Sequence, residues 1–396
     1  MFENKSIIIG VSGGIAAYKT AYLVSALSKT EADVNVIMTE NACEFISPLV
    51  FETLTGNKCY VDTFDRNFKF DVEHISLAKK ADIFMIAPAT ANVIAKIANG
   101  IADDMLTTTF LASKCKKIVS PAMNTAMFEN QITQDNIAKL KKYEIGVVEP
   151  QNGLLACGDT GAGKMPEPDF LFDVIEREIA REKDMLGKKV LVTAGATMES
   201  LDPVRFLTNH SSGKMGFAIA KEAMLRGAEV TVVKANTTAE IPNFVKIVEV
   251  SSAKDMFDAV TVLSDQQDII VKAAAVADYT PESYVDSKIK KKDGDLSISL
   301  KRTMDILKYL GENKKEGQFL CGFSMETDNM LENSKAKLSK KNADMIVANN
   351  LRDAGSGFKT DTNAVTLITR DGHRSLELKS KAEVAKEIFD EILGLI

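Results

Sequence analysis

The 396-residue sequence has no Trp, only three His and only five Cys. The Cys residues stand singly at positions 43, 59, 115, 157 and 321 and form no C-x-x-C pair, so neither a disulfide framework nor a zinc site is expected. The His residues, at positions 74, 210 and 373, cannot supply a His-rich metal centre by themselves. A site built on His or Cys therefore has to use single, specifically placed side chains.

The sequence also has little that suits a membrane or a nucleic acid. No apolar run reaches the roughly 18–20 residues that span a bilayer, and the N-terminus lacks the features of a signal peptide. The formal net charge of −6 disfavours non-specific nucleic-acid binding, which needs a basic surface. We therefore expect a cytoplasmic protein with neither a nucleic acid nor a membrane as a partner.

Composition and periodicity predict a two-domain α/β protein. Hydrophobic residues make up 45% and charged residues 26% of the chain, which excludes disordered and collagen-like classes. Short apolar strands alternate with helical stretches, so the first half is expected to form a flavodoxin-like, doubly wound parallel sheet. The second half predicts a Rossmann-like α/β domain with added antiparallel strands, among them 297–301 and a hairpin turned by Asp371-Gly372. A charged helix over 173–186 would separate domains 1–184 and 187–396.

Several motifs of the first half suit a bound cofactor. Gly10-Val-Ser-Gly13-Gly14 joins the first strand to the first helix, where it predicts either a phosphate site or only a tight turn. Its spacing differs from the dinucleotide fingerprint G-x-G-x-x-G. The segment 88–92 follows a later strand at the sheet edge where such folds bind ligands, although Thr90 or Asn92 could simply cap a helix.

The remaining motifs of the first half are weak when taken alone. A lone His such as His74 is usually solvated or part of the core, and the loop Pro121–Phe128 could merely pack its Met side chains. Residues 158–164 have the spacing of a P-loop, but Met165 replaces the Mg²⁺-binding hydroxyl and Pro166 stands where a helix should run. We therefore reject a P-loop, and the Gly- and Ala-rich segment 153–163 predicts a mobile flap that carries Cys157, or else an exposed loop.

The second half offers polar groups for a nucleotide. The segment 209–216 opens a predicted helix, and Asp278 follows a buried strand. Lys288-Ile-Lys290-Lys291-Lys292 is a dense basic run, and a second run includes Lys337 and Lys341. Each has a plain alternative: a capped helix, a turn Asp or a solvated surface. Basic runs and a strand-end Asp in a net acidic chain suit a metal–triphosphate.

Taken together, these motifs resemble the bifunctional enzymes of coenzyme A biosynthesis, which join phosphopantothenoylcysteine decarboxylase to phosphopantothenate–cysteine ligase. The resemblance covers nearly the whole chain and keeps the order of the motifs. His74, the Asn124 motif and Ala156-Cys157-Gly158 fall where the flavin-dependent decarboxylases have their catalytic His, substrate-binding Asn and flap Cys. The loops 193–197 and 209–213 and the Lys288 run match the ligases.

For the decarboxylase, the resemblance implies FMN, which gives the electrons released with CO₂ a place to go by oxidising the substrate thiol. His74 would be the acid/base group, Asn124 would hold the substrate carboxylate beside Met127, and Cys157 would protonate the enethiolate intermediate. The FMN phosphate would lie near Ser12, Gly13 and Thr39. The ring would lie near Pro88, Ala89, Thr90, Ala91 and Asn92.

For the ligase, the resemblance implies CTP, Mg²⁺ and an acyl-cytidylate from which cysteine displaces CMP. Asn209 would stabilise the acyl-cytidylate, Lys288 would contact the phosphates, and Asp278 would contact CTP or its metal. The further CTP-binding residues would be Ala273, Ala274, Met304, Asp305, Ile306, Leu307, Phe323, Lys337 and Lys341. The substrates would be 4'-phosphopantothenate and cysteine, and the ligase product would be the decarboxylase substrate.

The resemblance also implies a homo-oligomer, with a trimer-based decarboxylase that binds FMN at the subunit boundary and a dimeric ligase. The chain departs from the family pattern at Phe128, Lys164, Ala196, Met198, His210 and Met304. A flavin prenyltransferase, another flavodoxin-like oxidoreductase or a flavin-binding regulatory protein would be the rival interpretations. None of them explains His74, Asn124 and Cys157 together with a second domain.

Overall fold

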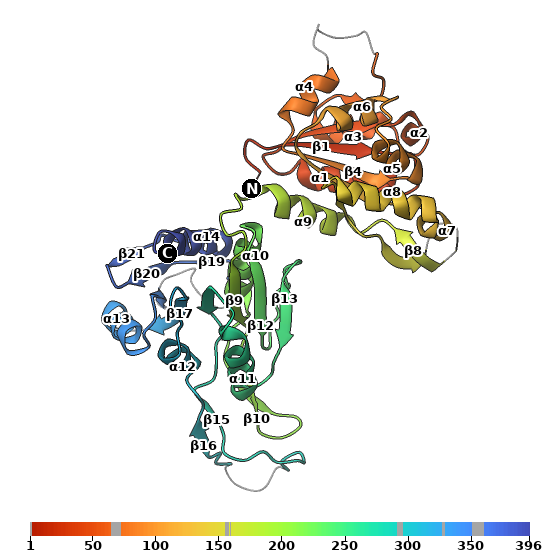
Figure 1. Ribbon diagram of the computed structural model, residues 1–396. Coiled ribbons are helices and arrows are strands. Elements are labelled where there is room, and N and C mark those ends of the chain that lie inside the picture. Colours follow the sequence, from red (N-terminus) through yellow and green to blue (C-terminus); the bar gives the residue numbers. More distant parts are fainter. Residues whose placement is uncertain are drawn as a thin grey trace. The chain divides into compact units, whose positions relative to one another are not determined.

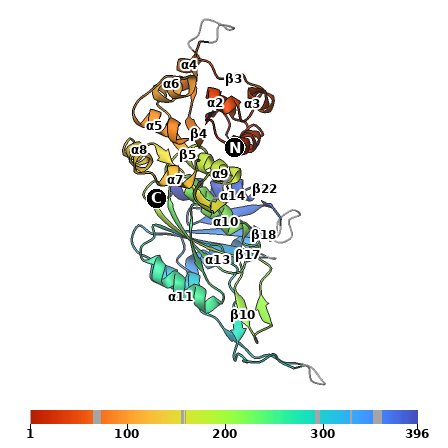
Figure 2. The ribbon, with the colours of Figure 1, turned by 90° about the vertical axis from the view of Figure 1, so that its right-hand side faces the viewer.

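The computed structural model describes residues 2–64, 73–154, 158, 160–290, 296–326, 329–350 and 360–396. The chain divides into two compact units, Met1–Arg181 and Glu182–Ile396 (Figure 1). Each unit contains a central β-sheet flanked by helices, as the turned view also shows (Figure 2). Within the described ranges, no helix is both long and apolar enough to cross a membrane.

The first unit contains a six-stranded parallel sheet with the order β3-β2-β1-β4-β5-β6. The strands are β1 (Ser6–Val11), β2 (Asp33–Met38), β3 (Cys59–Tyr60), β4 (Ile83–Ala89), β5 (Lys116–Pro121) and β6 (Gly146–Val147). Without the two-residue edge strand β3, the order is that of flavodoxin-like sheets, which bind ligands where the strand order reverses. That reversal lies between β1 and β4, so the predicted fold class is confirmed for this unit.

Helices cover both faces of the first sheet. One face carries α1 (Ala17–Leu27), α3 (Pro48–Thr55) and α9 (Pro168–Ile179), and the other carries α4 (Glu73–Lys80), α5 (Ala91–Ala98), α6 (Met105–Ala112) and α8 (Gln131–Lys142). Ile8, Phe84 and Val119 from three neighbouring strands form a core with the helices of the second face. The unit is completed by α2 (Glu40–Cys43), α7 (Thr125–Glu129) and a hairpin of β7 (Gln151–Leu154) and β8 (Thr160–Lys164).

The predicted helix over 173–186 is wrong at both ends. Helix α9 begins at Pro168, because proline suits the first helical position, where its missing N–H is not needed. It ends at Ile179, the last residue of the buried stripe that includes Leu171 and Ile175. The charged residues that follow continue no apolar stripe and are not helical.

The second unit contains an eight-stranded mixed sheet with the order β13-β12-β9-β14-β17-β18-β20-β21. Its parallel strands are β9 (Lys189–Ala194), β12 (Glu229–Lys234), β13 (Lys246–Glu249), β14 (Ile269–Lys272), β17 (Phe319–Glu326) and β18 (Met345–Asn350). They follow the Rossmann order, and the strands β20 (Val365–Thr369) and β21 (His373–Ser375) add antiparallel pairs. The predicted Rossmann-like domain with antiparallel additions is therefore confirmed.

The helices of the second unit also lie on both sheet faces. Helices α10 (Lys214–Leu225) and α14 (Lys381–Leu393) pack together on one face, while α11 (Ala253–Ser264), α12 (Ile306–Glu312) and α13 (Met330–Lys340) pack on the other. The capping box of Ser380 and Glu383 opens α14 as the spacing predicts. Three short antiparallel pairs complete the unit: β10 (Met198–Ser200) with β11 (Phe206–Thr208), β15 (Tyr279–Pro281) with β16 (Leu300–Arg302), and β19 (Thr362–Asn363) with β22 (Lys379–Ser380).

Two predicted strands of the second half differ from the structure. Only Leu300 and Lys301 of the predicted strand 297–301 belong to β16, because the partner strand β15 has three residues and ends at Pro281. The hairpin around Asp371-Gly372 is confirmed, but its second strand is His373–Ser375 and not the predicted Ser375–Lys379.

Candidate active sites

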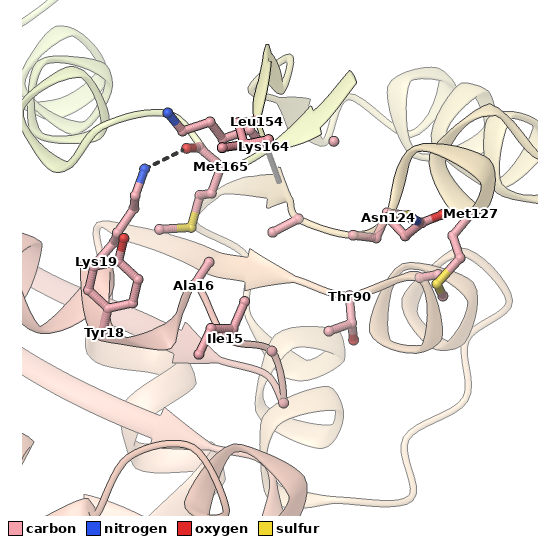
Figure 3. A pocket seen from close by; sticks show the side chains of 16 residues that line it. Ile15, Ala16, Tyr18, Lys19, Thr90, Asn124, Met127, Leu154, Lys164 and Met165 are labelled. Carbon is pink, nitrogen blue, oxygen red and sulfur yellow. Dashed lines mark hydrogen bonds between the residues drawn. The ribbon is translucent and has the colours of Figure 1, made fainter. Parts of the chain in front are cut away.

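A cavity of about 400 Å³ lies beyond the carboxyl ends of β1, β4 and β5 in the first unit (Figure 3). It brings together five residues that the sequence assigned to FMN or substrate: Gly13, Thr90, Ala91, Asn124 and Met127. The other lining residues are Gly14, Ile15, Ala16, Tyr18, Lys19, Ala122, Met123, Leu154, Gly163, Lys164 and Met165. The cavity is thus a mostly apolar pocket with a few polar groups, as is usual for a small-molecule site.

Ser12 fixes the loop after β1 to the loop after β4. Its buried hydroxyl donates a hydrogen bond to the carbonyl oxygen of Pro88 at 2.7 Å and accepts one from the N–H of Thr90 at 3.0 Å. Ser12, Pro88, Ala89 and Asn92 are not among the residues that line the cavity. The first two therefore support its wall.

Two further predicted positions are explained by local backbone geometry. Thr39 caps α2 by accepting a hydrogen bond from the N–H of Ala42, and it does not line the cavity. A Cβ atom at Gly13 would lie 2.6 Å from the Cβ atom of Asn41, which is too close, so the backbone of the next loop requires glycine there.

Asn124 holds its place at the start of α7. Its Oδ1 atom accepts a hydrogen bond from the N–H of Ala126 at 2.8 Å, and Figure 3 shows it beside Met127 on one side of the cavity. The β7–β8 hairpin is joined to this loop, because Met123 donates its N–H to the carbonyl oxygen of Gly163 at 3.1 Å. A Cβ atom at Gly163 would lie 2.3 Å from the Met123 carbonyl oxygen, and φ is +123°, so only glycine fits.

Lys19 is a cavity residue that the sequence analysis missed. Its side chain is buried in α1 and donates to the carbonyl oxygen of Met165 at 3.2 Å (Figure 3). It also forms an ion pair with Glu167 at 2.8 Å. The hydrogen bond from Lys19 is the largest influence on the Glu167 carboxyl and helps to lower its pKa. The sequence feature that could have identified Lys19 is its position on the apolar face of α1, which is the buried face of this helix.

The structure does not bring His74 to this cavity. His74 lies in the first turn of α4, is half-buried and is not among the lining residues.

Cys157 lies outside the described residues, whereas the four described Cys are all free. Burial, followed by the charge of Glu52, raises the pKa of Cys59 to about 12, and burial also raises the pKa of Cys321. Neither thiol is therefore a nucleophile near neutral pH.

Two neighbouring cavities of about 540 and 270 Å³ lie beyond β14 and against the end of β17 in the second unit. They share Lys272, Val276, Asp278, Phe323 and Lys337. The larger is also lined by the predicted CTP residues Met304, Asp305, Ile306, Leu307 and Lys341, and the smaller by Ala273 and Ala274. Eight basic and two acidic side chains line the pair, which makes the site electropositive.

Hydrogen bonds order the residues of the larger cavity. Asp305 caps α12 by accepting the N–H of Lys308 at 2.9 Å, and Lys341 forms an ion pair with the same carboxylate. Burial favours a higher pKa for Asp305, but the hydrogen bonds from Lys341 and Lys308 outweigh it and lower the pKa. Lys337 donates to the carbonyl oxygen of Phe323 at 2.9 Å.

Lys272 is the second residue that sequence reasoning missed. It ends the buried strand β14, lines both cavities and is half-buried. Burial and then the nearby charge of Lys337 lower its pKa to about 8, although Asp305 and Asp278 act in the opposite direction. The available signal was a Lys directly after the apolar run Ile269–Val271.

Asn209 and Lys288 lie outside the lining of both cavities. Asn209 is close to the smaller one, since its side-chain amide donates to the carbonyl oxygen of Ala275, a lining residue, at 3.2 Å. Lys288 is exposed, and the adjacent Ile289 donates its N–H to Asp202 at 3.0 Å. His210 is also exposed, and the family departure Met304 exposes about half of its side chain at the larger cavity.

Comparisons with known proteins cover the whole chain. Residues 1–180 match the Flavoprotein family, and residues 185–395 match the DNA/pantothenate metabolism flavoprotein C-terminal domain. The coenzyme A biosynthesis bifunctional protein CoaBC of Bacillus subtilis is 46% identical over 100% of this chain and 98% of the relative. The chain belongs to this family of bifunctional proteins. The predicted resemblance is thereby confirmed, and the first unit is a flavoprotein domain.

Other relatives agree with this assignment. The CoaBC proteins of Haemophilus influenzae and Escherichia coli K12 are 41% and 40% identical, and each alignment covers at least 98% of this chain and 97% of the relative. A solved C-terminal domain of CoaBC is 45% identical over 52% of this chain and 95% of its own, with a TM-score of 0.45. A PPC decarboxylase mutant complexed with pantothenoylaminoethenethiol is 30% identical over 43% of this chain and 96% of its own, with a TM-score of 0.40.

Proposed function

We propose that this chain makes 4'-phosphopantetheine in two steps. The domain 187–396 joins cysteine to 4'-phosphopantothenate through an acyl-cytidylate made from CTP, and the domain 1–184 decarboxylates the product with FMN. The observation that carries this proposal is the pairing of a mostly apolar pocket in a flavoprotein domain with an electropositive double cavity in the ligase-like domain of one chain. We propose a cytoplasmic location for the enzyme.

The residues of the first cavity fit FMN. The turn Gly13-Gly14 leads into α1, whose start has no side-chain cap, so its backbone N–H groups suit a phosphate. Ser12, Thr39 and the segment 88–92 shape the loops around it. When bound, FMN supplies the oxidising group that makes loss of CO₂ from the cysteine part possible.

The residues of the chain then hold the substrate and move protons. Because the Ala126 N–H fixes Oδ1 of Asn124, the amide is oriented to bind the substrate carboxylate, and Met127 packs beside it. His74 exchanges a proton with the substrate. Cys157 would protonate the enethiolate as the two electrons taken from the thiol return to the product, so that bound FMN would end in its starting oxidised state. Since His74 does not line the cavity of its own unit, we propose that the decarboxylase is a trimer-based assembly in which a neighbouring subunit supplies it at the boundary.

The second site fits CTP with Mg²⁺, and we propose a dimeric ligase. Within the described ranges, no three His, Cys, Asp or Glu side chains gather into a metal site. Mg²⁺ often uses one or two carboxylates together with substrate phosphates, so Asp278 would hold the metal together with CTP. Lys337 and Lys341 bind the nucleotide beside Phe323. Lys288 lies outside the lining of both cavities, and we propose that it contacts the phosphates of bound CTP. Asn209, fixed near Ala275, stabilises the acyl-cytidylate.

The proposal is tested by two measurements on the purified protein. The apoprotein should bind FMN stoichiometrically, and pyrophosphate should be released only when 4'-phosphopantothenate, Mg²⁺ and CTP are all present. Replacing CTP by ATP measures the nucleotide preference. A protein that binds no FMN would remove the decarboxylase part, and one that releases no pyrophosphate would remove the ligase part.

A further inference from the structure

Lys272 occupies the junction of the two cavities in the second unit. It is one of the five residues that line both of them, and it ends β14, which lies between β9 and β17 in the middle of the sheet. A lysine on a central strand is unusual, because its ammonium group loses hydration unless it is paired. This position suggests a binding role.

The charged neighbours of Lys272 leave it without a partner of its own. It faces Lys337 and Lys341 from α13 and the turn after it, Asp305 from the start of α12 and Asp278 from the loop after β14. The Asp305 carboxylate already pairs with Lys341. Among the described residues, the ammonium group of Lys272 has no hydrogen bond or ion pair.

The other cations of the cavities mostly have protein acceptors. In the smaller cavity, Lys214 pairs with Asp361 at 2.6 Å and Lys381 donates to the carbonyl oxygen of Thr360. In the larger, Lys308 lies 3.7 Å from Glu312. Burial lowers the pKa of Lys272, because an ammonium group that has lost hydration and has no anion beside it is unfavourable. An anion that bound at the junction would offset the lost hydration of this ammonium group.

Resting on the proposed ligase function, we propose that Lys272 is a phosphate-binding residue that holds a substrate phosphate group at the junction of the two cavities. A phosphate oxygen accepts a charge-assisted hydrogen bond from an ammonium group. Two substrates carry phosphate, namely the nucleotide with its triphosphate and 4'-phosphopantothenate. The position at the junction is compatible with either, so the test treats the two separately.

The test is calorimetric titration of the full-length protein with MgCTP and, separately, with 4'-phosphopantothenate. Lys272→Met removes the charge and shortens the side chain by one heavy atom, whereas Lys272→Arg keeps the charge. We expect Lys272→Met to weaken binding of one of the two ligands by about 10- to 100-fold, and Lys272→Arg to recover most of that loss. The ligand whose affinity falls is the one whose phosphate Lys272 binds.

Lys315→Met is the matched control, because Lys315 is an exposed lysine before β17, at the opposite end of that strand from the cavities. Thermal unfolding of the free protein checks that each variant is folded, and Lys272→Gln replaces Lys272→Met if the latter is not. Unchanged affinity of the uncharged variant for both ligands overturns the proposal. A wild-type protein that binds neither ligand overturns the proposed ligase function itself, which distinguishes the two failures.

Discussion

The hydroxyl of Ser12 donates a hydrogen bond to the carbonyl oxygen of Pro88 at 2.7 Å and joins the loops that follow β1 and β4. The Oγ atom of Ser12 also accepts the N–H of Thr90 at 3.0 Å, so this one side chain links the end of β1 to two backbone groups on the β4 side of the point where the strand order reverses. The cavity of the first unit lies directly beyond these loops. Its shape therefore depends on a residue that does not line it.

Replacing Ser12 with Ala should weaken FMN binding. The change leaves the Thr90 N–H without its acceptor, which costs about 1–3 kcal/mol for a buried group and loosens the loop. We expect the Kd for FMN, measured by flavin fluorescence, to rise about tenfold. Ser28→Ala is the matched control, since the buried Ser28 hydroxyl has no hydrogen-bond partner. Equal FMN affinity of Ser12→Ala and wild type would contradict the role given to Ser12.

Replacing Gly163 with Ala should disrupt decarboxylation. The new Cβ atom would lie 2.3 Å from the Met123 carbonyl oxygen at a backbone φ of +123°, so the hairpin must separate from the Asn124 loop. We expect decarboxylation of 4'-phosphopantothenoylcysteine to fall at least tenfold, by roughly 1.4 kcal/mol or more. Gly153→Ala in the same hairpin has room for its Cβ and should retain activity. Comparable activity of the two variants would show that the hairpin–loop contact is unimportant.

Removing the charge of Lys272 should stabilise the ligand-free protein in a pH-dependent way. Its pKa in the fold is lowered to about 8, so below pH 8 the folded protein holds an unfavourable ammonium group. Between pH 8 and about 10.5, the folded protein has lost this proton while the unfolded chain still keeps it, so wild-type stability rises with pH. The stability gain of Lys272→Met should therefore be full at pH 7 and shrink toward pH 10.

Urea unfolding of the apoprotein at pH 7 and pH 10 measures this difference, with Lys315→Met as the reference. A gain that is the same at both pH values would mean that Lys272 does not titrate as its surroundings indicate. Saturating MgCTP should reverse the order of stabilities at pH 7 if the nucleotide phosphate is the group that Lys272 binds.

Replacing Lys288 with Gln should abolish ligation and leave decarboxylation intact. Lys288 belongs to the second unit, and the described residues that line the proposed FMN cavity all belong to the first. Pyrophosphate release from MgCTP and CO₂ release from supplied 4'-phosphopantothenoylcysteine measure the two activities separately. Loss of both activities would show that the two domains do not act independently.

The sequence predicted the layers of the fold better than the ends of its elements. Short apolar strands such as Ser6–Val11 identified the parallel strands of both sheets, because strands buried on both faces must be apolar throughout. The end of α9 was predicted too late, because the charged residues after Ile179 suit a helix in the sequence. The buried apolar stripe of α9 ends at Ile179, and the helix ends with it. The residues that follow the strands, such as Thr90 and Asp278, were placed correctly at the sheet edges.

The sequence could not reveal what depends on distant packing. In the sequence, Lys19 and Lys272 look like ordinary lysines. The fold buries Lys19 against Met165 and places the half-buried Lys272 where two cavities meet. His74 is not among the residues that line the cavity of its unit, and no local sequence pattern predicts this. The family resemblance selected His74 and Cys157 as the reactive residues, and both assignments stay predictions. The burial of Cys59 and Cys321 raises the pKa of both thiols, so neither is a nucleophile near neutral pH.

The central claim is that one chain performs ligation and then decarboxylation, and a coupled assay tests it most directly. The purified protein would be given 4'-phosphopantothenate, cysteine, Mg²⁺ and CTP, while pyrophosphate and CO₂ are followed in time. The account predicts a lag before CO₂ release and then equal amounts of pyrophosphate, CO₂ and 4'-phosphopantetheine. Pyrophosphate released without any CO₂ from FMN-loaded protein, or CO₂ released without CTP, would contradict it.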